Sequence, residues 1–289
     1  MTNGGWRSLF FAPANRHDLI GKFHRFEADN YVIDLEDGTP EDQKDWAREH
    51  LREATSSARQ KPLSGRLLVR INTGSMAAAE RDLAAALACD VDGIVVPKIE
   101  KAEDIRFIEA MIDQSLGDRP FCIVGGVESL RGVLAFQIIA SVASRMESVY
   151  FGAEDLIAEL GGQRSRSGLE VIHARQHVVL VAKSAPMAAI DMAVTEIHDD
   201  ELFVEDSGRG RSFGYDGKIC LNPAQVKLAN RLFSPGAAEI GHARRLLAAF
   251  EAGVAAGRGT ISFEGQMIDE PLVKRARAII ASVPEGAAS

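Results

Sequence analysis

Short apolar runs alternate with longer stretches of helical period along most of this chain, and this alternation constrains the fold more than any other feature. Several runs are almost continuously apolar, such as YVIDL, LLVRI, GIVVPK and SVYFG. Strands of this kind are typical of parallel sheets that helices cover on both faces. Eight strand-then-helix units predict a (β/α)₈ barrel of the TIM type, with an open doubly wound sheet as the alternative. The predicted strands are 7–12, 30–35, 66–72, 93–98, 121–127, 148–153, 187–191 and 217–222, and one of the helices predicted between them spans 41–59.

The chain is longer than such a barrel requires. It has 289 residues, whereas one barrel typically takes about 250. We therefore expect the barrel to occupy residues 1–233 and a C-terminal extension to occupy 234–289. The residue pattern of this extension predicts a helix over 237–256, a hairpin around Glu264 and Gly265, and a last helix from Glu270. We expect it to pack on the barrel mouth or on a neighbouring subunit.

Composition narrows the class of protein. The net charge of -8 and the lack of a basic stripe argue against a nucleic-acid partner. No apolar run approaches the roughly 18 residues that a membrane span needs, and no signal peptide is visible at the N-terminus. The three cysteines match no zinc spacing and no full disulfide framework, so a cytoplasmic protein with free thiols is expected.

Polar residues follow almost every predicted strand. Because ligands of parallel α/β folds bind at the carboxyl ends of the strands, these residues are expected to meet in one mouth. Buried charges are costly unless they pair or coordinate a metal, and an acid-rich set without a histidine pattern favours Mg²⁺ over zinc. The residues are Asp34, Glu36, Asp37, Arg70, Asn72, Lys98, Glu100, Glu128, Glu154, Asp155 and Asn222.

The ordered motifs resemble the citrate lyase β-subunit-like group of the HpcH/HpaI aldolase superfamily, which includes malyl-CoA and citramalyl-CoA lyases. The resemblance implies a barrel of the phosphoenolpyruvate/pyruvate type. It is carried by RSLFFAPANR at 7–16, VIDLEDGTP at 32–40, VRIN at 69–72, GIVVPKIE at 93–100, VESLRGV at 127–133, FGAEDL at 151–156, YDGKICLNPAQV at 215–226 and FEGQMIDEPLVKRAR at 263–277.

The resemblance implies roles for individual residues. Glu128 and Asp155 would be ligands of Mg²⁺, with Mn²⁺ as a substitute, and Arg70 would contact the substrate carboxylate or thioester oxygen. Arg7 would be a second anion-binding residue. The remaining roles fall to Glu36 and Asp37 as acids near the metal water, Lys98 and Asn222 as substrate contacts, Lys218 near the CoA moiety, and Asp269 as an acid/base from an adjacent subunit.

One departure and one segment leave questions open. This group commonly has CIHP in its eighth strand, whereas this chain has CLNP, so Asn222 cannot transfer a proton. The basic, glycine-rich segment 157–168 has two interpretations, an acyl-CoA or carboxylate pocket and a plain surface loop.

The implied activity is cleavage or formation of a carbon–carbon bond in a 3-hydroxy-3-carboxyacyl thioester, similar to citryl-, malyl- or citramalyl-CoA. Three alternatives are a thioesterase on the same fold, a Schiff-base aldolase that uses Lys98, and a non-catalytic acyl-binding subunit of a larger lyase. If Asp269 acts across subunits, a homotrimer or homohexamer is expected.

Overall fold

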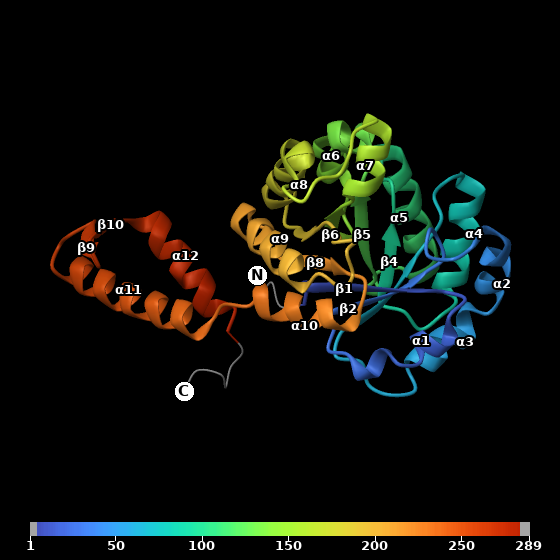
Figure 1. The fold of residues 1–289 in the computed structure, drawn as a ribbon, viewed down its shortest axis with the longest axis horizontal. Helices are drawn as coiled ribbons and strands as arrows, with labels where there is room; N and C mark the ends of the chain where they lie inside the picture. Colours follow the sequence, from blue (N-terminus) through green and yellow to red (C-terminus); the bar gives the residue numbers. More distant parts are fainter. Residues whose placement is uncertain (1–4, 284–289) are drawn as a thin grey trace. The chain divides into compact units, whose positions relative to one another are not determined.

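The computed structural model describes residues 5–283, which form two compact units, Gly5–Phe233 and the segment that starts at Ser234. The first unit is a closed barrel of eight parallel strands in sequence order, with helices around it (Figure 1). The predicted barrel is therefore confirmed and the open sheet is excluded. The strands are β1 (Ser8–Pro13), β2 (Asn30–Asp34), β3 (Arg66–Arg70), β4 (Gly93–Val96), β5 (Cys122–Val127), β6 (Met146–Phe151), β7 (Ala188–Asp191) and β8 (Gly217–Cys220).

Closure comes from the first strand, which pairs with both the second and the last. Leu9 of β1 lies opposite Asn30 of β2 on one side and opposite Ile219 of β8 on the other. Alternate residues point to opposite faces of a strand, so one set fills the barrel and the other faces the helices. Each strand contributes at least one apolar residue to the interior set, which includes Leu9, Val32, Leu68, Val95, Val124, Tyr150, Ile190 and Ile219.

The helices connect consecutive strands and cover the outside of the barrel (Figure 1). The helix expected over 41–59 is instead divided, because the backbone leaves helical geometry at His50, whose ring stacks on Trp46. The helices are α1 (His17–Ile20), α2 (Lys44–Glu49), α3 (Leu51–Ala58), α4 (Met76–Leu87), α5 (Ala102–Leu116), α6 (Leu130–Val142), α7 (Ala153–Leu160), α8 (Ile172–Ser184), α9 (Asp200–Phe213) and α10 (Pro223–Leu232).

The second unit contains α11 (Ala237–Ala255), the antiparallel pair β9 (Ile261–Phe263) and β10 (Gln266–Ile268), and α12 (Glu270–Ala281). It has its own small core of Ala243, Leu246, Phe250, Ile268, Val273 and Ala276. Its expected docking on a barrel mouth or a neighbouring subunit stays a prediction.

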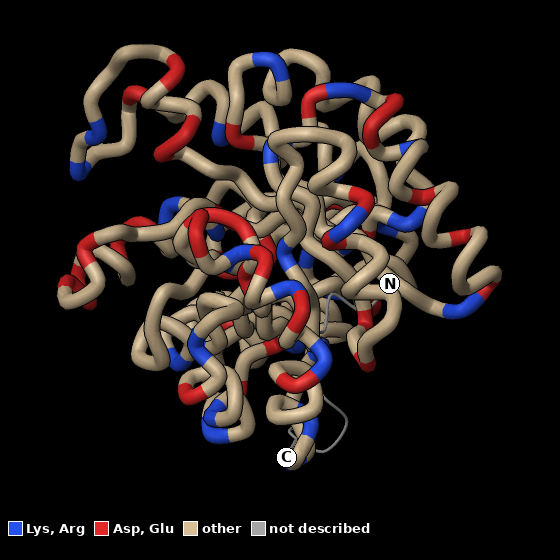
Figure 2. The backbone as a smooth tube through the Cα atoms, turned by 90° about the vertical axis from the view of Figure 1, so that its right-hand side faces the viewer, with Lys and Arg blue, Asp and Glu red and all other residues tan. Residues whose placement is uncertain are grey.

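Lysine and arginine positions are interspersed with aspartate and glutamate positions along the described backbone, as Figure 2 shows. Within residues 5–283, none of the helices is long and apolar enough to cross a bilayer.

Candidate active site

A cavity of about 470 Å³ opens at the carboxyl ends of the barrel strands. The closed parallel sheet brings all eight of these ends to one rim, where the loops after different strands can share a site. Residues expected from three separate motifs, Arg70, Glu128 and Asp155, line this cavity together. The sequence prediction that these three residues meet is therefore supported by the fold.

Arg70, the last residue of β3, is a mostly buried cation that neighbouring acids hold in place. Its Nε and Nη2 donate to Asp34 Oδ1 and Oδ2 at 2.7 and 2.6 Å, and its Nη1 lies 3.0 Å from Glu36 Oε2. Burial lowers the pKa of Arg70, but the hydrogen bonds and charge of Asp34 outweigh this effect and raise it. The guanidinium therefore stays charged and is held in one orientation at the cavity wall.

Asp34 orients Arg70, a role that the sequence interpretation did not give it. Besides binding Arg70 through both oxygens, it accepts the backbone N–H of Glu36 at 2.9 Å and of Gly38 at 2.8 Å. A Cβ on Gly38 would lie 2.3 Å from Asp34 Oδ2, so the turn after β2 can approach this carboxylate only with glycine there.

Glu128 follows β5 and is only 5% exposed. Its Oε1 accepts the hydroxyl of Tyr150 at 2.7 Å and the backbone N–H of Lys98 at 2.8 Å. Burial is the largest influence on this carboxyl; it outweighs the Tyr150 hydrogen bond and raises the pKa of Glu128 to about 7. Tyr150 also went unnoticed in the sequence, because a tyrosine within an apolar run resembles a core residue.

Asp155 lies in the first turn of α7, where the helix dipole favours a negative charge. Its Oδ2 is 3.3 Å from the ammonium of Lys98, which also lies 2.8 Å from Glu36 Oε1 and 3.3 Å from Asp37 Oδ2. Burial lowers the pKa of Lys98, but the hydrogen bond and charge of Glu36 outweigh it and raise the pKa. A lysine held protonated is a poor nucleophile, which disfavours the Schiff-base alternative.

The chemistry of this residue set fits a hard divalent cation. The five carboxylates of Asp34, Glu36, Asp37, Glu128 and Asp155 outnumber the two cations Arg70 and Lys98. Between residues 5 and 283, no group of three or more His, Cys, Asp or Glu side chains is arranged around one metal position. Two carboxylates with other positions left to water and substrate are typical of Mg²⁺ rather than of Ca²⁺ or zinc.

Two residues with predicted roles lie away from this cavity. Arg7 precedes β1 and therefore lies at the amino end of the barrel, where its Nη2 pairs with Asp29 Oδ1 at 2.7 Å. Lys218 is fully buried and its ammonium pairs with Asp191 at 3.0 Å and Asp206 at 2.6 Å. Neither side chain belongs to the cavity at the strand ends.

Asn222 and Asp269 each precede a helix. Asn222 caps α10, since its Oδ1 accepts the N–H of Gln225 at 2.9 Å while its Nδ2 donates to the carbonyl of Ile197 at 2.8 Å. Asparagine is a preferred N-cap residue, so this role accounts for its presence after β8. Asp269 precedes α12 in the second unit, so its proposed part in catalysis stays a prediction.

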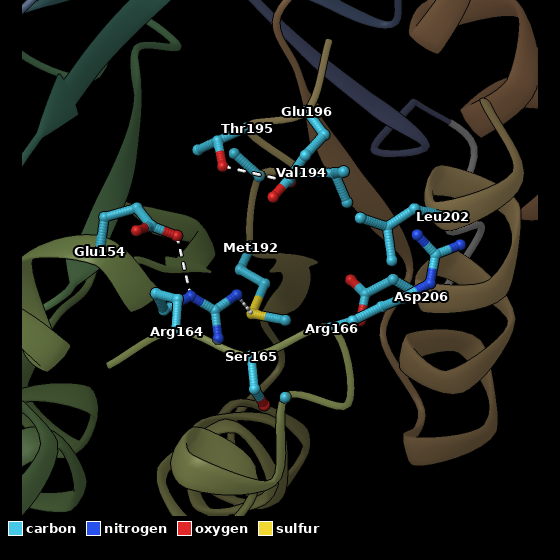
Figure 3. A pocket seen from close by; sticks show the side chains of 12 residues that line it. Glu154, Arg164, Ser165, Arg166, Met192, Val194, Thr195, Glu196, Leu202 and Asp206 are labelled. Atoms are coloured by element: carbon cyan, nitrogen blue, oxygen red, sulfur yellow. Dashed lines mark hydrogen bonds and ion pairs between the residues drawn. The ribbon is translucent and has the colours of Figure 1, made fainter. Parts of the chain in front are cut away.

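The basic segment 157–168 borders a second, smaller cavity of about 140 Å³ (Figure 3). Arg164 Nε lies 2.9 Å from Glu154 Oε1, and another of its nitrogens pairs with Glu170. Glu154 and Ala193 line both this cavity and the larger one. The segment therefore contributes to the wall beside the mouth, which favours the pocket interpretation over a plain surface loop.

Comparisons with known proteins identify a family and several relatives. The family profile described as HpcH/HpaI aldolase/citrate lyase matches residues 7–223. A citrate lyase subunit beta-like protein from Deinococcus radiodurans is 40% identical over 276 residues, which are 95% of this chain and 96% of the relative. The mitochondrial citramalyl-CoA lyase of Homo sapiens is 30% identical, over 94% of this chain and 83% of that protein.

Solved structures of citrate lyase beta-subunit proteins have a similar fold. The protein CitE of Mycobacterium tuberculosis, in complex with magnesium, acetoacetate and coenzyme A, superposes with a TM-score of 0.80 at 29% identity, covering 97% of this chain and 99% of that one. A citrate lyase beta subunit from the same organism, complexed with oxaloacetate and magnesium, has a TM-score of 0.68 at 30% identity, over 81% and 99% of the two chains.

Proposed function

This chain belongs to the HpcH/HpaI aldolase/citrate lyase family, and we propose that it is a magnesium-dependent lyase that cleaves or forms a carbon–carbon bond in a 3-hydroxy-3-carboxyacyl thioester. The observation that carries the proposal is the convergence of Glu128, Asp155 and Arg70 in one cavity at the strand ends. Relatives and solved neighbours named for citramalyl-CoA, oxaloacetate, acetoacetate and coenzyme A support the substrate class.

Glu128 and Asp155 would hold Mg²⁺, which when bound supplies a Lewis acid for the oxygen atoms of the substrate. Glu128 takes part only as a carboxylate, so its raised pKa couples metal loading to loss of a proton. The hydroxyl of Tyr150 and the backbone N–H of Lys98 both donate to Oε1 of Glu128 and fix the orientation of its carboxylate. Such donors behind a ligand set its position and its basicity.

Arg70 would stabilise the charge that develops on the thioester. A guanidinium has five N–H donors, and the contacts to Asp34 and Glu36 engage three of its nitrogens without using every hydrogen. In cleavage, the C2–C3 bond breaks, the 3-hydroxyl gives its proton to water and becomes a keto group, and the electron pair of the broken bond forms the thioester enolate. The enolate then takes a proton at C2 and leaves as the shortened acyl thioester.

Asp269 is our proposed donor of that last proton. Its N-cap position before α12 leaves its side chain without a capping hydrogen bond to the helix. We propose that a neighbouring copy of the chain supplies it, which requires a closed homo-oligomer such as a trimer or hexamer.

The direct test is product analysis with the purified full-length chain. We expect citramalyl-CoA, malyl-CoA or citryl-CoA to yield an oxo acid and acetyl-CoA in equal amounts, with no turnover in EDTA. Glu128→Gln and Asp155→Asn should each abolish turnover, whereas Glu103→Gln, on the exposed first turn of α5, should leave it unchanged. Release of free CoA without an oxo acid would show a thioesterase instead, and full activity in EDTA would exclude the metal.

A further inference from the structure

Lys98 is the residue that both acids of the proposed metal pair contact. Its backbone N–H donates to Glu128 Oε1 at 2.8 Å, and its ammonium lies 3.3 Å from Asp155 Oδ2. The same ammonium is 2.8 Å from Glu36 Oε1 and 3.3 Å from Asp37 Oδ2. One positive charge therefore lies among three carboxylates.

The backbone of Lys98 adopts a conformation that residues other than glycine disfavour. Its φ of 49° falls in the left-handed region, which a residue with a Cβ adopts at a cost. Glycine would adopt this conformation without strain, yet the chain carries a long cationic side chain there. The conformation directs the N–H of Lys98 to Glu128, and the side chain extends to the acids after β2 and in α7.

Charge balance explains what the ammonium does. Arg70 is already engaged with Asp34 and Glu36, so its charge is directed to the β2 side of the site. Asp155 is 43% exposed and Asp37 is 60% exposed, and both face the Lys98 ammonium. Like charges this close repel, so the acids need a cation to stay assembled when no metal is bound.

We propose that Lys98 is a resident competitor for the divalent cation: its ammonium neutralises the carboxylate cluster in the metal-free protein and must leave Asp155 when the metal binds. The inference rests on the proposed function, because it takes Glu128 and Asp155 as the metal ligands. Lys98 is thus a positioning residue: its charge holds the acids together in the metal-free protein and makes the site bind its cation less tightly than it would without this charge.

The test measures Mg²⁺ binding to the purified full-length protein by isothermal titration calorimetry, without substrate. Lys98→Met keeps the aliphatic stem and removes the charge, and Lys98→Gln is a second neutral variant. Even with the screening of bulk water, removing a unit charge a few ångströms from a divalent ion strengthens binding by about tenfold or more. Lys98→Arg keeps the charge and should retain the wild-type affinity.

A second readout is thermal stability. The metal-free Lys98→Met protein should melt at a lower temperature than the wild type, and saturating Mg²⁺ should raise its melting temperature more than it raises that of the wild type. Lys101→Met, at an exposed lysine three residues further on, is the matched control and should behave as the wild type in both measurements.

Two results would overturn the inference, and they are distinguishable. If Glu128→Gln abolishes wild-type Mg²⁺ binding, but Lys98→Met and Lys98→Gln bind Mg²⁺ no more tightly than the wild type, the inference alone is wrong. If none of these proteins binds Mg²⁺, the proposed metal site fails and the inference fails with it.

Discussion

The buried carboxyl of Glu128 makes metal binding depend on pH in a range where an ordinary glutamate would not. The pKa of Glu128 in the metal-free protein is about 7, and a metal ligand must be deprotonated. The ionised fraction of Glu128 is then about 0.9 at pH 8 and about 0.03 at pH 5.5. Lowering the pH from 8 to 5.5 should therefore lower the apparent Mg²⁺ affinity about 30-fold. A glutamate with a pKa near 4.5 would lose only about 10% of its affinity over the same interval.

The assay is calorimetric titration of the full-length protein with Mg²⁺ between pH 5.5 and 8, in two buffers of different ionisation enthalpy. We expect about 0.9 protons to be released per ion bound at pH 6, and about 0.5 at pH 7. Tyr150→Phe removes a hydrogen bond that lowers the pKa of Glu128, so it should move the transition to higher pH. A Mg²⁺ affinity that stays constant over this pH interval would show that Glu128 does not titrate there or does not bind the metal.

The same pKa predicts the sign of a stability effect. Since the pKa of about 7 in the folded protein exceeds the ordinary glutamate value of 4.5, the carboxylate is disfavoured in the folded protein. This penalty is absent below about pH 4.5, grows as the pH rises, and is complete above about pH 7, where it reaches about 3 kcal/mol. Metal-free Glu128→Gln should therefore unfold at higher denaturant concentration than the wild type at pH 8, and the difference should shrink toward pH 5.

Three further predictions concern other residues of the account. Arg70→Lys should lower kcat by roughly 100-fold, about 3 kcal/mol, because a lysine cannot reproduce the forked contact with Asp34 and the developing oxyanion; an unchanged kcat would remove Arg70 from the chemistry. Asn222→Ala should cost about 1 kcal/mol of unfolding free energy, measured by denaturant titration, by removing the cap of α10, with Asn222→Asp as the conservative control. If Asp269 acts across subunits, Asp269→Asn and Arg70→Met chains should each be inactive, and co-expressed chains should regain activity; no recovery in isolated mixed oligomers would contradict that arrangement.

The fold was readable from the sequence because each strand is an apolar run that ends in polar residues. All eight strands lie within two residues of their predicted bounds, for example Arg66–Arg70 against the predicted 66–72. The helix expected over 41–59 failed because the stacking of His50 on Trp46, which accompanies the break, has no periodic signature.

The sequence predicted the position of site residues that directly follow a strand. It did not predict contacts between residues from distant segments. Arg70, Glu128 and Asp155 follow their strands and meet as expected. Arg7 precedes its strand, and its place before the first residue of β1 already indicates the opposite edge of a parallel barrel. Lys218 is different, because its buried pairing with Asp206 on α9 depends on packing between elements that no local pattern reveals.

The role of Asp34 also depends on contacts that the sequence does not show. It ends β2 as the sequence indicates, but its hold on Arg70 requires β2 and β3 to pair in the register that places Asp34 opposite Arg70. Register of this kind follows from tertiary packing, so the carboxylate was visible as a strand-end acid and its task of orienting the guanidinium was not.

The most direct measurement of the central claim is a crystal structure of the full-length protein with Mn²⁺ in place of Mg²⁺, using anomalous scattering to locate the ion. We expect one strong peak bound by the carboxylates of Glu128 and Asp155, in the cavity that Arg70 lines. We also expect the Lys98 ammonium to have left Asp155. A peak at another position, or none at this pair under saturating Mn²⁺, would contradict the proposed metal site.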